Sequence, residues 1–154
     1  MSENKEKAKS NEYEFINLEI VTKDGNIVYS DKVAMVNFPG VEGVFTVMGG
    51  HTPFLSTLRI GEIKYKLSDE DLIYKYATVI GGICEVNGDK INVITNACEL
   101  AEKIDVKRAE NSKQRAEERL KNPTEEIDVK RADYSLQRAN IRIAVANSFT
   151  AANK

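Results

Sequence analysis

The sequence contains no tryptophan, one histidine and only two cysteines in its 154 residues. Cys84 and Cys98 have no CxxC spacing and no histidine near them, so a structural zinc site has no ligand set. Each cysteine lies inside or beside an apolar run, which is typical of a buried free thiol. We therefore expect free cysteines, a reducing compartment and no bound metal.

Long apolar runs are also absent. No segment approaches the roughly 20 apolar residues that cross a bilayer. Residues 1–12 are charged and lack the apolar stretch of a signal peptide. The sequence predicts a mobile tail over residues 1–12 and a cytoplasmic protein that meets a membrane only through a partner.

Motifs of catalysis are missing as well. The sequence has neither the phosphate loop G-x-x-x-x-G-K-[ST] nor the nucleophile elbow G-x-S-x-G. His51, within Gly49-Gly50-His51-Thr52-Pro53, is the lone histidine. The acidic first part of the chain and the lack of an aromatic platform argue against nucleic acid. We expect a protein without catalysis of its own, and a small enzyme only if His51 proves catalytic.

Residues 13–98 have the pattern of a β domain. Short β-rich runs alternate with turn signals such as Asp24-Gly25 and Asn87-Gly88. Gly81-Gly82 is interpreted as a break between two strands. Many short strands at this spacing predict an antiparallel β-sandwich or a flattened barrel. The expected strands cover residues 15–21, 27–29, 33–36, 44–48, 63–67, 73–80, 83–86 and 91–95.

Residues 99–154 differ in composition. They lack glycine and are rich in Ala, Glu, Lys, Arg and Gln, which favour helices. Asn122-Pro123 interrupts them, so the pattern predicts two antiparallel helices over residues 99–121 and 124–147. The charge balance changes too: residues 1–103 carry 11 Lys/Arg against 16 Asp/Glu, whereas residues 104–154 carry 11 against 8. The two regions are therefore expected to have different roles.

An internal repeat relates the two predicted helices. The six residues Ile-Asp-Val-Lys-Arg-Ala occur at 104–109 and again at 127–132. The match continues through Ser112 and Ser135, and through Gln-Arg-Ala at 114–116 and 137–139. Both helices are therefore interpreted as copies of one hairpin-forming unit.

Arginine is concentrated in this repeat. At about 100° per residue, the three arginines of each helix fall within roughly 40° of one another. The planar guanidinium group binds phosphate and carboxylate groups bidentately, so the two stripes are candidate phosphate ligands. The alternative is two solvated faces with local ion pairs, such as Asp105 with Arg108 and Asp128 with Arg131. The stripes contain Arg108, Arg115 and Arg119 on the first helix and Arg131, Arg138 and Arg142 on the second.

The apolar faces of the two helices are small. Alanine dominates both, so the area that the pair buries is modest at roughly 25 cal/mol per Å². Two such helices need support from the β domain, a partner or a ligand, and such a marginal element can change its docking, as a switch does. The apolar positions are Ala109, Ala116 and Leu120 on the first helix, and Ala132, Leu136, Ala139, Ile143 and Ala146 on the second.

Several short motifs, taken together, resemble the epsilon subunit of F-type ATP synthases. The resemblance covers about residues 14–147 and depends on the order and spacing of the motifs together. They are Pro39-Gly40-x-Glu42-Gly43, the run from Gly49 to Leu55, Gly61, Gly81-Gly82 and the repeated Asp-x-x-Arg-Ala.

The resemblance implies a β-sandwich at residues 13–98 that binds the gamma subunit and the membrane c-ring. It implies a helical hairpin at residues 99–154 that folds on the sandwich or extends along gamma into the alpha and beta subunits, where it inhibits ATP hydrolysis. ATP, the implied regulatory ligand, would bind the folded hairpin. Carried over by position, its site would contain Glu99, Ile104, Asp105, Arg108, Ala109, Arg115, Arg138 and Arg142.

Two other interpretations stay open. A free-standing nucleotide-sensing module would have the same arginines without a rotary partner. A purely structural hairpin would have no ligand at all. The resemblance places the protein at the cytoplasmic face of the membrane, and whether its complex moves protons or sodium ions is decided in other subunits.

Overall fold

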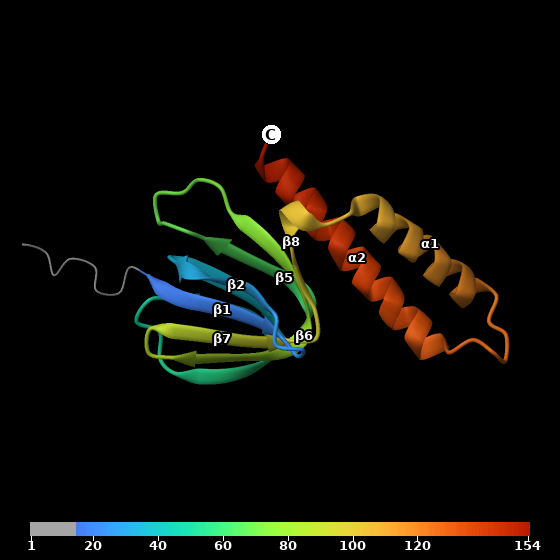
Figure 1. Ribbon diagram of the computed structural model, residues 1–154, viewed down its shortest axis with the longest axis horizontal. Helices are drawn as coiled ribbons and strands as arrows, with labels where there is room; N and C mark the ends of the chain where they lie inside the picture. The colour runs from blue at the N-terminus through green and yellow to red at the C-terminus, as the bar shows by residue number, and fades with distance from the viewer. Residues whose placement is uncertain (1–14) are drawn as a thin grey trace, which may run out of the picture.

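The computed structural model describes residues 15–154, so the tail predicted over residues 1–12 lies outside the described residues. A β-sandwich is followed by two helices that lie side by side at one side of it (Figure 1). The predicted fold class, a sandwich followed by an antiparallel two-helix hairpin, is confirmed.

Eight strands form the sandwich, in the order β2-β1-β7-β6-β5-β3-β4, with β8 paired to β6. Every pair is antiparallel except β1 with β7, which run parallel, with residues 17–22 beside residues 90–95. The sequence did not predict this parallel pair, because its partners lie far apart along the chain. The strands are β1 Ile16–Thr22, β2 Ile27–Val33, β3 Met35–Gly40, β4 Gly43–Met48, β5 Phe54–Lys66, β6 Lys75–Asn87, β7 Lys90–Thr95 and β8 Cys98–Leu100.

Gly81 and Gly82 lie inside β6, so their interpretation as a break between strands was wrong. Both have positive φ, 67° and 142°, which glycine adopts without the steric cost that a side chain brings. A Cβ on Gly82 would lie 2.2 Å from the carbonyl oxygen of Ile94, so β7 approaches too closely for any side chain. The strand bends here, pairing with β7 on one side of the bend and with β8 on the other.

The core of the sandwich is apolar and tightly closed. Side chains alternate between inside and outside along β1, where Ile16, Leu18 and Ile20 are buried. Tyr65 and Phe38 are the largest side chains that are fully buried. Both cysteines are buried and free, as expected. This core contains residues of the strands alone and none of the two long helices.

The repeat sets where each helix begins. Asp105 precedes α1 (Val106–Lys121) and Asp128 precedes α2 (Val129–Ala152). Each carboxylate accepts a hydrogen bond from the backbone N–H three residues later, at 3.0 and 3.1 Å, which is an N-cap. The helices therefore start later than residues 99 and 124, the starts that composition predicted. The strand β8 and a short 3₁₀ helix, η1 (Ala101–Lys103), occupy the residues before the first cap.

The two helices differ in their surroundings. α2 contacts β5, β6 and η1, whereas α1 packs chiefly against α2 and lies on its outer side (Figure 1). Most of the fully buried helix residues are alanines, with Ala109 and Ala116 on α1 and Ala132, Ala139 and Ala146 on α2. Within residues 15–154, no helix combines the length and the apolar character that crossing a membrane requires.

Candidate functional site

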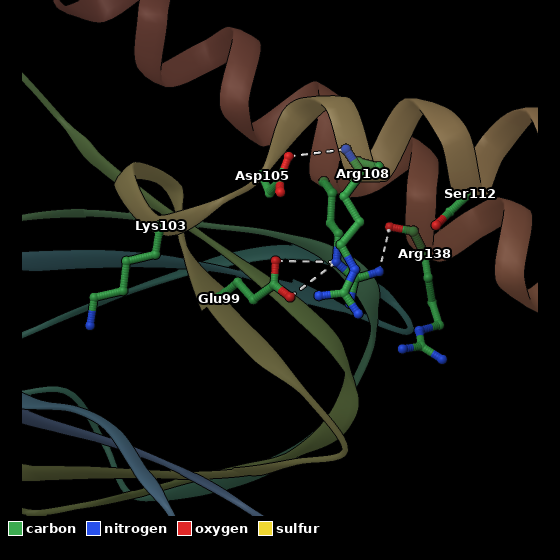
Figure 2. Close-up of a pocket in the computed structure, with 8 residues that line it drawn as sticks. Glu99, Lys103, Asp105, Arg108, Ser112 and Arg138 are labelled. Carbon is green, nitrogen blue, oxygen red and sulfur yellow. Dashed lines mark hydrogen bonds and ion pairs between the residues drawn. The ribbon is translucent and has the colours of Figure 1, made fainter.

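A polar pocket of ≈ 240 Å³ lies where the first turns of α1 meet α2 and β8. We call it the inter-helix pocket (Figure 2). Its walls carry four basic and two acidic side chains, so positive charge is in excess. The lining residues are Glu99, Lys103, Asp105, Arg108, Ala109, Ser112, Arg138 and Arg142.

The wall from α1 follows directly from helix geometry. Asp105, Arg108, Ala109 and Ser112 are spaced at i, i+3, i+4 and i+7, so they share one face. Ala109 is buried against the neighbouring helix, and its small side chain lets the two backbones come close. The Asp105 carboxylate is held at the helix start by its bond to the Arg108 amide. Its negative charge is therefore already engaged with backbone donors.

The wall from α2 is fixed by one ion pair across the domain boundary. Arg142 Nε donates to both carboxylate oxygens of Glu99 on β8, at 3.2 and 3.1 Å. Its Nη1 also donates to the carbonyl oxygen of Arg138 at 3.4 Å. The Arg142 side chain is largely covered, with 19% of its surface exposed, so its interaction with Glu99 is less screened than a surface pair. The guanidinium group of Arg142 is thus already paired with a carboxylate of the protein itself, that of Glu99.

Arg138 has a different orientation. Figure 2 shows its guanidinium group directed away from the Glu99 carboxylate. Its Nε is buried and has no hydrogen-bond partner among the described residues. The guanidinium carbon lies 5.6 Å from the ring centre of Tyr134, within the range of a cation–π contact. Arg138 therefore brings unused donors to the edge of the inter-helix pocket.

Six of the eight residues predicted as the nucleotide site line this pocket. Ile104 and Arg115 do not. The Ile104 amide donates to the carbonyl of Ala101 at 3.2 Å, and Arg115 donates to the Ser112 hydroxyl at 3.2 Å. Sequence reasoning missed Lys103 and Ser112. Ser112 had a signal, because it recurs in the repeat on the same helical face as Arg108.

The predicted local ion pairs take another form. Asp105 and Asp128 bind the backbone amides of Arg108 and Arg131, not their guanidinium groups. The only ion pairs among the described residues join Arg142 with Glu99 and Lys90 with Glu19. A carboxylate just before a helix has the free amides of the first turn closest to it, and these compete successfully with a flexible side chain.

The repeat also produces a second pocket at the other end of the hairpin. Asp128, Arg131, Ala132 and Ser135 of α2 take the places of Asp105, Arg108, Ala109 and Ser112, and Arg119 of α1 takes the place of Arg142. The counterpart of Lys103 is Glu126, which reverses one charge. This second pocket has two basic and two acidic side chains, so the inter-helix pocket is the stronger site for an anion.

The other candidate groups lie elsewhere. His51 lies between β4 and β5, where Nδ1 is 2.7 Å from the carbonyl oxygen of Thr52. Burial raises the pKa of the Cys84 thiol to about 12, so this thiol stays protonated at neutral pH. The described part of the chain has no cluster of three or more His, Cys, Asp or Glu side chains that could hold a metal ion.

Comparisons with known proteins agree with the fold and with the sequence motifs. Two family models match: "ATP synthase, Delta/Epsilon chain, beta-sandwich domain" over residues 15–101 and "ATP synthase, Delta/Epsilon chain, long alpha-helix domain" over residues 102–147. The ATP synthase epsilon chain of Nitratidesulfovibrio vulgaris (strain DP4) is 44% identical over 105 residues, covering 68% of this chain and 75% of that one. The Staphylococcus aureus (strain JH9) epsilon chain is 39% identical over 131 residues, covering 85% and 96%. A chain in the cryo-EM structure of the Euglena gracilis mitochondrial ATP synthase has a TM-score of 0.65 at 17% identity, covering 100% of this chain and 91% of that one.

Proposed function

The chain belongs to the ATP synthase delta/epsilon chain family, as a bacterial F-type epsilon subunit, and from this we propose that it joins the rotor stalk and regulates ATP hydrolysis. Its sandwich binds the gamma subunit and the c-ring at the cytoplasmic face of the membrane. Its hairpin inhibits hydrolysis when it extends toward the alpha and beta subunits. ATP binds the compact hairpin and relieves this inhibition.

One observation carries the ATP proposal: the inter-helix pocket takes basic side chains from both helices. Arg108 comes from α1, whereas Arg138 and Arg142 come from α2. A phosphate chain that contacts all three binds only while the helices lie side by side on the sandwich. Since a ligand shifts an equilibrium only by its differential affinity for the two states, ATP would favour the compact state.

The size of the inter-helix pocket indicates which part of the nucleotide it holds. Its volume of ≈ 240 Å³ is smaller than the roughly 300–1,000 Å³ typical of ligand sites. We assign most of the phosphate chain to it, because guanidinium groups match phosphate oxygens, and the rest of the nucleotide lies outside it. Phosphate oxygens would compete with Glu99 for Arg142.

The contacts of the hairpin support a reversible release. Its fully buried residues are five alanines and Val145, and larger apolar side chains such as Leu136 and Ile143 are only partly buried, so the apolar area that fixes it is modest. Among residues 15–154, a single ion pair, Arg142 with Glu99, joins α2 to the sandwich. A hairpin held this weakly exchanges partners without unfolding the sandwich.

The outer surface of the sandwich supports a protein partner. Four apolar side chains form a row across neighbouring strands, and in three of them at least half of the surface is exposed. Rows of this kind mark docking surfaces on soluble proteins. In strand order they are Ile27 on β2, Val21 on β1, Ile94 on β7 and Ile83 on β6.

Calorimetric titration of the full chain with ATP tests the regulatory proposal. We expect saturable binding that weakens at least tenfold in Arg108→Ala and in Arg142→Ala, because each loses a charge-assisted hydrogen bond to phosphate. Arg131→Ala is the matched control, since Arg131 is the repeat counterpart of Arg108 and lies outside the inter-helix pocket. Absence of saturable heat at millimolar ATP contradicts the proposal.

Co-purification with the gamma subunit tests the stalk assignment separately. A stable complex without ATP supports it, whereas a chain that binds ATP but not gamma is a free-standing sensor. In the assembled enzyme, removing residues 105–154 is expected to increase ATP hydrolysis at low ATP. Unchanged hydrolysis would leave the stalk role and contradict the inhibitory one.

A further inference from the structure

A second cleft adjoins the inter-helix pocket, at the junction between the sandwich and α2. It has a volume of ≈ 380 Å³ and two basic side chains, Lys23 and Arg138, but no carboxylate among its lining residues. We call it the junction cleft. Its walls come from the turn between β1 and β2, from β6, from the residues after β7 and from α2. The lining residues are Lys23, Ile80, Asn96, Ala97, Tyr134 and Arg138.

Arg138 is common to both cavities. It lines the inter-helix pocket and the junction cleft, and its guanidinium group is directed away from Glu99 (Figure 2). Its buried Nε lacks an acceptor in the described part of the chain. Buried N–H groups are nearly always paired in folded proteins, so an acceptor is missing at this position. The positive charge of the group makes an anion the fitting acceptor.

Lys23 supplies the second charge from the sandwich. Its backbone N–H donates to the Thr95 carbonyl at 3.0 Å, which fixes the turn against β7. The neighbouring Asp24 is engaged within the same turn, where it accepts hydrogen bonds from the Thr22 hydroxyl and from the Asn26 amide. The Lys23 ammonium has no ion pair among residues 15–154. It is therefore available for a ligand in the junction cleft.

We propose that Lys23 and Arg138 form a subsite in the junction cleft for the terminal phosphate of a nucleoside triphosphate whose other phosphates lie in the inter-helix pocket. This inference depends on the proposed function and adds to it a residue of the sandwich. Because Lys23 belongs to the sandwich and Arg138 to the hairpin, the terminal phosphate ties the two directly. The subsite thereby makes the compact state sensitive to the triphosphate and less sensitive to a shorter phosphate chain.

Titration of the full chain with ATP, ADP and inorganic phosphate tests the subsite. In Lys23→Ala we expect about tenfold weaker binding of ATP and less than twofold weaker binding of ADP, since only ATP loses a charge-assisted contact. Lys90→Ala is the matched control: it removes an ammonium group from the same sandwich, but one paired with Glu19 at 3.9 Å. Lys23 is exposed on a turn, so its substitution leaves the fold intact.

The outcomes separate this inference from the proposed function. One outcome is that the wild-type chain binds ATP, while Lys23→Ala weakens the binding of ATP and ADP equally or leaves both unchanged. In that case the proposed subsite is wrong and the proposed function stands. If the wild-type chain binds inorganic phosphate through Lys23 but does not bind ATP, the proposed ATP response fails, and the junction cleft is a free-phosphate site instead of a nucleotide subsite.

Discussion

The sandwich and the hairpin are built on different amounts of apolar burial. The sandwich encloses large side chains such as Phe38, Ile63 and Tyr65, all at 0–1% exposure. The hairpin fully buries only alanines and one valine, and it adds polar contacts at the inter-helix pocket. Stability in the sandwich therefore comes from its own core, whereas the hairpin depends on what it contacts. This difference fits the proposed function, in which the sandwich is a fixed scaffold and the hairpin changes position.

The largest expected effect comes from truncating the sandwich core. Phe38→Ala removes a fully buried ring that lies 5.5 Å from the ring of Phe45. We expect a loss of about 3–5 kcal/mol in the free energy of unfolding. Ala116→Gly in α1 should cost only about 1 kcal/mol, through helix propensity. Urea denaturation followed by tyrosine fluorescence measures both, and equal costs would contradict the difference between the two parts.

Alkaline pH should act on the sandwich alone. Burial raises the pKa of Cys84 and of Cys98 to about 12, and the charge of Glu99 adds to the effect at Cys98. Since the thiols of the unfolded chain lose their protons around pH 9 and those of the folded chain do not, the free energy of unfolding should be nearly constant below about pH 8. It should then fall by about 3 kcal/mol for the pair by pH 10.

The measurement is urea denaturation at pH 7, 9 and 10. A Cys84→Ala, Cys98→Ala double variant is the control, because it should lose most of the decrease between pH 9 and pH 10. Burial also raises the pKa values of Tyr29 and Tyr65, so a further decrease should remain above pH 10 in both proteins. An equal decrease in the double variant would place the alkaline sensitivity in another group.

The smallest effect compares the two caps of the repeat. Asp105→Ala and Asp128→Ala each remove an N-cap, so each should destabilise its helix by about 1 kcal/mol. Hydrogen exchange of the first-turn amides should then increase about fivefold in α1 or α2 respectively. Only Asp105 lines the inter-helix pocket, so only Asp105→Ala should also change ATP affinity. A change in ATP affinity for Asp128→Ala would contradict the assignment of the site.

Much of the fold could be predicted from local patterns. Turn residues such as Asp24-Gly25 and Asn87-Gly88 separate strands as expected, and the glycine-free region forms the two helices. The bend at Gly81-Gly82 could not be predicted, because two glycines have the same local signature in a turn and in a kinked strand. The parallel pairing of β1 with β7 depends on distant partners, which no local pattern encodes.

The candidate site was predictable in part. Helical spacing and the resemblance together identified Arg108, Arg138 and Arg142, which the fold brings to one pocket. Arg115 lies on the same stripe as Arg108 but about two turns further along α1, and there it binds Ser112. The stripe is longer than the pocket that it borders. The proposed role of Lys23 had no signal in the sequence, since it depends on how the turn between β1 and β2 meets α2. ATP binding at these residues stays a prediction.

The parallel pair of β1 and β7 has a consequence for how the protein is made. Residues 17–22 emerge from the ribosome early, yet their partners at 90–95 follow only after most of the sandwich has been translated. Contacts so distant along the chain close slowly, because the loop between them must first lose its entropy. In the nascent chain, β1 can therefore pair only with β2 at first, and its other edge stays unpaired. That edge is covered once β7, the strand at residues 90–95, has left the exit tunnel. Translation pauses before that point would leave an open strand edge available for aggregation.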